Sequence, residues 1–369
     1  MLMIINCLIF NGMSMEYPLF MYSYGGKIYS AQLESNHTFK LNNITVFNEN
    51  DGSYGMDYII NQNIIIYKSE IDKEYLYKTL IGLNSTNEEK FSPALYESEN
   101  IAIDWIHDLI YFDCDYNICV MNISNKRMRR IIAYNEVYVD IVVDPIESFI
   151  FWSTDTRVVD IRTNDTKNLI IRANQDGSNR TILIDTKEYS PCSLAIDFVN
   201  KAIYFIQYIE TNLKLLSIDY NGNNVNSIVE FNSFSLSSLS CRILDFYDKA
   251  LYLYNYDSEE FLKISPNNTS YNIISRKIEI DNADSISKPK YSSRPDLDLY
   301  IGMMKIIDPS RQPYVENRCN DSNCSHLCLP KPNNSNNFIC LCPEEQYLIP
   351  GEICPSVCHY VKSLTHLIE

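Results

Sequence analysis

The 369-residue chain is too long for one small domain and long enough to bury a sizeable core. Its Asp and Glu residues (47) outnumber Lys and Arg (31), which gives a formal net charge of −16 at pH 7. Because net negative charge repels phosphate backbones, the composition argues against nucleic acid as a partner and favours basic protein surfaces.

The chain begins with an apolar run, Met1–Phe10, of signal-peptide length, with small residues at Gly12 and Ser14 but no basic segment before it. Two interpretations stay open for residues 1–16: a signal peptide or a truncated N-terminus. No other stretch reaches the ~18 apolar residues of a membrane span, so we expect any membrane anchor to lie outside this chain.

A short repeat follows, in which an apolar strand ends in Asp, a turn intervenes, and a second apolar or aromatic strand begins. A worn copy contains Asp57, and four clearer copies are 101–112, 141–152, 194–205 and 242–253. The runs are too short for helices and are bounded by turn-forming residues, so each copy predicts an antiparallel hairpin. Two further strand-like runs follow most hairpins, with turns predicted at Asp176-Gly177 and Asn221-Gly222.

The copies recur at intervals of roughly 40–50 residues, which is the spacing of four-stranded propeller blades. A sixth copy is divided between the two ends of residues 17–313: Pro18–Tyr22 resembles the partner of an inner strand in Lys305–Pro309. Pairing these segments closes the ring and removes the open sheet edge. The sequence therefore predicts an all-β fold, a six-bladed β-propeller over residues 17–313.

The aspartate of each copy has a predicted structural role, because an Asp at a strand end accepts backbone N–H bonds in the connection that follows. These residues are Asp57, Asp104, Asp144, Asp197, Asp245 and Asp308. The interval before Asp308 is long, so we expect Ser275–Arg294, which is polar, to loop out as a disordered insertion or as part of a binding surface.

Six of the 12 cysteines fall in the short segment that follows the repeats, within predicted domain 314–355; residues 356–369 are a tail or the start of a further module. The six are Cys319, Cys324, Cys328, Cys340, Cys342 and Cys354. Six cysteines allow 15 pairings, which spacing alone does not resolve. A zinc site at Cys324, His326 and Cys328 is the rival interpretation, disfavoured in an oxidising compartment.

Cysteines and sequons outside this segment also indicate secretion. Cys114 and Cys119 fit a bridge between neighbouring strands, and Cys192 and Cys241 occupy matching places before two inner strands; Cys7 and Cys358 have no predicted partner. Candidate N-glycosylation sites recur along the chain: Asn36, Asn43, Asn84, Asn122, Asn164, Asn179, Asn267 and Asn268, with Asn320, Asn323 and Asn333 in the cysteine-rich part.

The tetrads YFDC at Tyr111, FWST at Phe151, YFIQ at Tyr204 and YLYN at Tyr252 resemble the YWTD motif of low-density lipoprotein receptor class B repeats. The phrase NCSHLCLPKP is similar to the EGF-like module that follows such propellers. This resemblance implies the disulfides Cys319–Cys328, Cys324–Cys340 and Cys342–Cys354. No Asp-x-Asp/Asn-Glu pattern precedes Cys319, so calcium binding of the EGF type is not expected.

The resemblance implies an extracellular module that binds a protein ligand in an endocytic or signalling receptor; the ligand classes are lipoprotein, Wnt-pathway and matrix proteins. A nidogen-like secreted or matrix scaffold is the alternative. Acid release of cargo needs groups that titrate near pH 6, and the propeller offers only His37 and His107. The face that binds cannot be assigned, and Trp105, His107, Glu147 and Tyr247 are the candidate ligand-face residues, with His107 expected to be solvated.

A propeller hydrolase is the less probable function on sequence grounds. The chain has no Gly-rich phosphate loop, no Gly-x-Ser-x-Gly motif, and no pair of titratable groups that stands apart from the repeat. We therefore expect no enzymatic activity, no metal and no cofactor.

Overall fold

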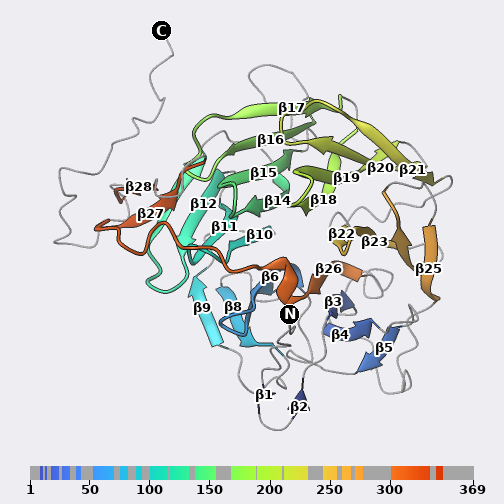
Figure 1. The fold of residues 1–369 in the computed structure, drawn as a ribbon, viewed down its shortest axis with the longest axis horizontal. Helices are drawn as coiled ribbons and strands as arrows, with labels where there is room; N and C mark the ends of the chain where they lie inside the picture. Colours follow the sequence, from blue (N-terminus) through green and yellow to red (C-terminus); the bar gives the residue numbers. More distant parts are fainter. Residues whose placement is uncertain are drawn as a thin grey trace, which may run out of the picture.

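The fold consists of antiparallel sheets arranged in a ring around a common centre (Figure 1). The computed structural model describes residues 9–10, 13–14, 18–24, 27–33, 39–42, 53–69, 75–81, 89–93, 100–114, 117–132, 138–154, 168–187, 189–209, 212–231, 244–255, 260–266, 271–276, 301–332 and 338–343. Within these residues there are six four-stranded sheets, and the predicted all-β propeller is confirmed.

Five of the four-stranded sheets are built from consecutive strands, which pair in chain order. The first is β6 (Ser53–Ile59), β7 (Ile64–Ser69), β8 (Tyr75–Leu80) and β9 (Glu89–Pro93). The second is β10 (Ile101–Asp104), β11 (Leu109–Cys114), β12 (Asn117–Asn122) and β13 (Met128–Ile132). The third is β14 (Tyr138–Asp144), β15 (Phe149–Thr154), β16 (Leu169–Asn174) and β17 (Thr181–Asp185).

The fourth sheet is β18 (Pro191–Asp197), β19 (Ala202–Ile209), β20 (Asn212–Asp219) and β21 (Asn226–Phe231). The fifth is β22 (Leu244–Tyr247), β23 (Ala250–Asn255), β24 (Glu260–Ile264) and β25 (Tyr271–Arg276). Because β25 extends through Arg276, Ser275 and Arg276 belong to a strand and not to the predicted loop. The rest of that predicted insertion lies outside the described residues.

The remaining four-stranded sheet joins the two ends of the repeat region. It is ordered β26 (Ile301–Ile307), β3 (Leu19–Tyr24), β4 (Lys27–Leu33) and β5 (Phe39–Asn42). Lys305 pairs with Met21, and Ile306 pairs with Phe20. This confirms the predicted pairing of Pro18–Tyr22 with Lys305–Pro309. The inner strands β6, β10, β14, β18, β22 and β26 contact one another in this order, and β26 contacts β6.

Three smaller elements complete the described structure. A two-stranded sheet pairs β1 (Ile9–Phe10) with β2 (Met13–Ser14), and residues 1–8 of the predicted signal segment lie outside the described residues. A 3-10 helix, η3 (Pro309–Arg311), follows β26. In the cysteine-rich tail, β27 (Leu327–Pro330) pairs with β28 (Phe338–Leu341).

The sheets pack on one another through buried apolar faces, as alternating strand residues require. The second and third sheets enclose a cluster that contains the fully buried Trp152 together with Leu327 and Leu329 of the tail. The tail is therefore packed against the outside of these two sheets, beside β12 (Figure 1). No helix among the described residues is long and apolar enough to cross a membrane.

Two turns between outer strands, predicted at Asp176-Gly177 and Asn221-Gly222, contain glycines whose backbone conformation requires that residue. Gly177 and Gly222 have φ values of +82° and +79°, a region that glycine adopts without a steric penalty. A Cβ at position 177 would lie 2.3 Å from the Ile131 carbonyl oxygen of the neighbouring sheet. A side chain at position 177 would therefore be opposed both by backbone strain and by steric overlap with the neighbouring sheet.

Replacing Gly177 with alanine should therefore lower the free energy of unfolding by about 1–3 kcal/mol, since it combines an unfavourable φ with a backbone clash. Urea denaturation measures the change. Val225→Ala, at a side chain that is 45 % exposed, is the control and should change stability by less than about 0.5 kcal/mol. Equal stabilities of the Gly177→Ala variant and the unmodified chain would contradict the close approach of the two sheets.

Candidate functional site

The turns that follow the inner strands are shaped by the repeated aspartates. Asp104 Oδ1 accepts hydrogen bonds from the backbone N–H groups of Ile106 and His107, at 2.9 and 3.0 Å. Asp144 and Asp197 accept the corresponding pairs of bonds in the next two sheets, and Asp308 caps η3 by accepting from Ser310 N. These bonds satisfy N–H groups that the tight turn leaves without a ladder partner.

Two of the repeated aspartates link neighbouring sheets instead. Asp57 Oδ2 accepts from Ile103 N at 2.8 Å, and Asp245 Oδ2 accepts from Ile306 N at 2.8 Å. Asp140, which is not part of the repeat pattern, makes the same kind of bond to Leu194 N at 2.7 Å. The predicted bonds to the following connection are thus found at Asp104, Asp144, Asp197 and Asp308. Asp57 and Asp245 also have structural roles, but their bonds cross to the neighbouring sheet instead.

Residues directly after the repeated Asp lie at the ring centre in three sheets. Tyr58, Trp105 and Phe198 line a cavity of about 50 Å³ on the axis, together with residues of β10, β14, β18 and β26. This volume is far below the roughly 300–1,000 Å³ of typical small-molecule sites. Among the described residues, this central cavity is therefore too small for such a molecule, and the proposed partner would meet the surface of the ring.

Charged groups in this central cavity are paired within the protein. Arg311 donates from Nη1 and Nη2 to the two carboxylate oxygens of Asp245, at 2.6 and 2.8 Å. Burial raises the pKa of Asp57, while the nearby Lys305 and the N–H of Ile103 oppose that rise. Gln312 donates to Tyr58 O and accepts from Ile60 N, which fixes η3 against the first sheet.

An aromatic pair, Trp105 and Phe198, lines the cavity. The Trp105 and Phe198 rings meet edge to face with centroids 5.5 Å apart, and Trp105 Nε1 lies 3.5 Å from Pro313 O. Val199, which follows Phe198 in the chain, is 88 % exposed, and Tyr314, which follows Pro313, is 95 % exposed. We call Trp105, Phe198, Val199 and Tyr314 the channel-mouth patch. Exposed apolar side chains next to half-buried aromatic rings are typical of protein-binding surfaces.

The four predicted ligand-face residues do not lie together in the structure. Trp105 belongs to the channel-mouth patch, whereas Tyr247 is half-buried and donates its hydroxyl to Asp308 Oδ2 at 3.1 Å. Glu147 pairs with Lys201 at 2.7 Å and lines a separate groove beside β15. Sequence reasoning missed Phe198, Val199 and Tyr314, although Phe198 follows Asp197 just as Trp105 follows Asp104.

The prediction that His107 is a solvated ligand-face residue is wrong. His107 is 3 % exposed, and its Nδ1 lies 2.7 Å from Asp104 Oδ2. The carboxylate that accepts the turn N–H groups also draws the imidazole inward, because a buried carboxylate oxygen needs a second partner.

Disulfides connect cysteines in three places in the described structure: Cys114–Cys119, Cys319–Cys328 and Cys324–Cys340. Each of these is one of the predicted pairs. Cys342 is also disulfide-bonded, but its predicted partner Cys354 lies outside the described residues. Cys241, the predicted partner of Cys192, lies outside them as well. The zinc interpretation is excluded, since the sulfurs of Cys324 and Cys328 are both in disulfides. Among the described residues, no group of three or more His, Cys, Asp or Glu side chains could hold a metal ion.

The cysteine-rich tail is held to the ring by arginines as well as by apolar packing. Arg318 donates to Ser148 Oγ, to Ile146 O at 2.5 Å and to Lys331 O at 2.8 Å. From the ring, Arg127 donates to Ser325 O and Arg129 to Cys342 O. These charge-assisted bonds fix the tail against the second and third sheets.

Comparisons with known proteins agree with the fold. No family model matches the chain. The proto-oncogene tyrosine-protein kinase ROS of Gallus gallus is 22% identical over 173 residues, which are 46% of this chain and 7% of that protein. This chain thus corresponds to a small part of that relative.

Among solved structures, one from a nidogen/laminin complex superposes with a TM-score of 0.56 and 15% identity, over 70% of this chain and 96% of that chain. TolB from Acinetobacter baumannii gives a TM-score of 0.54 and 12% identity, over 72% of this chain and 66% of that chain. At these identities the likeness shows the fold, a propeller that resembles the one in nidogen. Together with the disulfides, it suggests an extracellular protein.

Proposed function

We propose that this chain is an extracellular module that binds a protein ligand through the channel-mouth patch. In this proposal the sheets are the blades of a six-bladed YWTD propeller, and the disulfide-bonded tail is an EGF-like domain. The single observation that carries the proposal is the exposure of Val199 (88 %) and Tyr314 (95 %) beside the Trp105–Phe198 ring pair. Large exposed apolar side chains around aromatic anchors match the composition of interface centres.

The size and the side chains of the central cavity favour a role in surface binding over a catalytic role. Its volume of about 50 Å³ admits no sizeable substrate. The carboxylate of Asp245 is occupied by Arg311, and that of Asp57 by backbone N–H groups. Such groups act as structural links and not as a general base with access to a substrate. The proposal therefore assigns no enzymatic step to this module.

The partner in this proposal is an extracellular protein of the matrix, lipoprotein or Wnt-pathway class. The resemblance to the YWTD repeats supports a receptor of the low-density lipoprotein receptor type, endocytic or signalling. The alternative, a matrix scaffold, is favoured by the likeness to nidogen, which was solved in a complex with laminin.

Photo-crosslinking tests the proposed surface. A benzophenone amino acid placed at Tyr314 should capture an extracellular protein from conditioned medium, because this side chain is exposed at the centre of the proposed interface. The matched control is the same probe at Ile182, which is 49 % exposed on the outer strand β17. Adding Phe198→Ala to the Tyr314 probe should reduce the yield of the captured protein by at least about fivefold, as loss of an aromatic anchor does.

Equal capture at Tyr314 and Ile182 would contradict the channel-mouth patch as the binding surface. Capture at Ile182 alone would move the interface to the outer edge of the third sheet. Failure of both probes to capture any extracellular protein would count against the binding function itself.

A further inference from the structure

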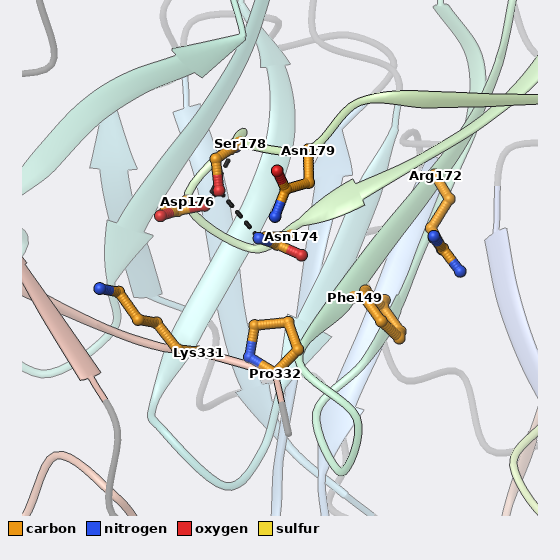
Figure 2. Close-up of a pocket in the computed structure, with 8 residues that line it drawn as sticks. All are labelled: Phe149, Arg172, Asn174, Asp176, Ser178, Asn179, Lys331 and Pro332. Atoms are coloured by element: carbon orange, nitrogen blue, oxygen red, sulfur yellow. Dashed lines mark hydrogen bonds between the residues drawn. The ribbon is translucent and has the colours of Figure 1, made fainter. Parts of the chain in front are cut away.

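A second cavity lies where the tail meets the third sheet. It has a volume of about 540 Å³ and lies between the β16–β17 turn, the start of β15 and the residues that follow β27. Figure 2 shows Asn174, Ser178 and Asn179 on one side of it, Phe149 and Arg172 on another, and Lys331 and Pro332 across the opening. The volume lies within the roughly 300–1,000 Å³ of sites that hold small molecules.

One wall of this cavity is itself an N-glycosylation sequon. Asn179, Arg180 and Thr181 form the Asn-x-Thr pattern, and the Asn179 side chain is exposed at a φ of 55°. Thr181 Oγ1 donates to Asn179 O at 3.2 Å. In Figure 2 the Asn179 amide is on the cavity side of the turn, above Asn174. An exposed asparagine in a turn is the ordinary setting for this modification.

Asn122, another sequon asparagine of the described ring, contrasts with Asn179. It is half-buried, and its Oδ1 accepts a hydrogen bond from Asn125 N at 2.9 Å. A glycan bonds to Nδ2, which must be accessible to the transferring enzyme, so the half-buried Asn122 side chain is the poorer acceptor. The structure thus favours glycosylation at Asn179 over Asn122.

The cavity walls supply both kinds of contact that a sugar ring requires. The Phe149 and Pro332 rings offer apolar surface, and Asn174 and Asp176 carry hydrogen-bonding groups. Arg172 lies over the Phe149 ring, 4.6 Å from its centroid, and donates to Tyr220 O at 2.6 Å. These contacts hold the wall in place before any ligand arrives, which lowers the ordering cost of binding.

We infer that Asn179 carries an N-linked glycan and that its first N-acetylglucosamine occupies this cavity, joining the tail at Lys331 and Pro332 to the β16–β17 turn. The modification rests on the extracellular location in the proposed function. Asn179 Nδ2 bonds to C1 of a polyprenyl-diphosphate-linked oligosaccharide, the bond from C1 to the phosphate oxygen breaks, the lipid diphosphate departs, and the amide loses one proton.

Glycopeptide mass spectrometry of the full chain, secreted from eukaryotic cells, should find Asn179 occupied and Asn122 unoccupied. Asn179→Gln and Thr181→Ala each remove the sequon and should abolish the glycan at this position. Thr181→Ser is the matched control, because it retains the sequon. An unmodified Asn179 in the secreted chain would overturn the inference.

Enzymatic trimming tests the place of the first sugar. An endoglycosidase that leaves one N-acetylglucosamine on Asn179 should leave hydrogen exchange in residues 327–332 unchanged. An amidase that removes the entire glycan should raise exchange there about fivefold or more, within the usual range of site-to-site coupling. Unchanged exchange after complete removal would show that the glycan points away from the cavity. Ligand capture at Tyr314 tests the proposed function separately, so the two failures are distinguishable.

Discussion

Replacing Arg311 with alanine is expected to lower the free energy of unfolding by about 3–5 kcal/mol, the usual cost of removing one partner from a buried ion pair. Arg311 and Asp245 have side-chain exposures of 14% and 5% and are joined by two hydrogen bonds. Asp245 Oδ2 also accepts from Ile306 N on β26, the strand that closes the ring. The substitution would leave the Asp245 carboxylate buried without its counter-ion.

Thermal and urea denaturation of the full chain measure this effect, and hydrogen exchange locates it. We expect the amides of β26 and β3 to lose protection first, because they form the sheet that joins the chain ends. Lys201→Ala is the control, since the Lys201–Glu147 pair has exposures of 54% and 27% and should contribute at most about 1 kcal/mol. Similar losses in the two variants would refute a special role for the Arg311–Asp245 pair.

The ring could be predicted from the sequence because the same pattern repeats in each sheet. The Asp104 and Asp197 copies keep the same spacing between the Asp and the second strand, although neither has an exact YWTD tetrad. This spacing is retained because each inner strand packs between the inner strands of the two neighbouring sheets. The pairing of Lys305–Pro309 with Pro18–Tyr22 could be predicted for the same reason, since an unpaired edge in a ring is unfavourable. The same periodicity does not predict a receptor type, because it specifies the ring and not the partner.

The candidate site was only partly predictable because its residues are brought together by the ring and not by the repeat. Trp105 and Phe198 occupy the same repeat position, so a search for aromatic residues directly after the repeated Asp would have found both. Tyr314 lies beyond the last repeat and follows Pro313, whose carbonyl oxygen meets Trp105. His107 was misplaced, since turn position alone does not reveal that Asp104 binds its imidazole.

The sequence marks Asn179 as a candidate glycosylation site, but the cavity beside it could not be predicted. Asn122 and Asn179 both begin Asn-x-Ser/Thr triplets, and an Asn-rich chain contains many of these. What distinguishes Asn179 from Asn122 is the exposure of its side chain, together with the position of that side chain beside the cavity that the tail borders. Both features depend on which segments fold back onto the turn.

Replacing Leu329 with alanine should lower the free energy that holds the tail on the ring by about 2–5 kcal/mol, as deletion of a buried leucine side chain does. Leu329 has 0% exposure and lies in one apolar cluster with Ile132 of β13 and Leu169 of β16. The disulfides Cys319–Cys328 and Cys324–Cys340 keep the tail internally connected. The expected result is therefore release of the tail as a unit, with the ring left folded.

Limited proteolysis and hydrogen exchange of residues 318–332 measure that release, while the β18–β21 sheet serves as an internal reference within the same molecule. Ile182→Ala, at an exposed position of β17, should leave both regions unchanged. If Leu329→Ala lowers protection of the tail and of β18–β21 equally, the tail and ring unfold as one cooperative unit, and the tail would then be part of the propeller's own core. If neither region changes, the apolar contact contributes little, and polar contacts such as those of the three arginines and of His326 hold the tail in place.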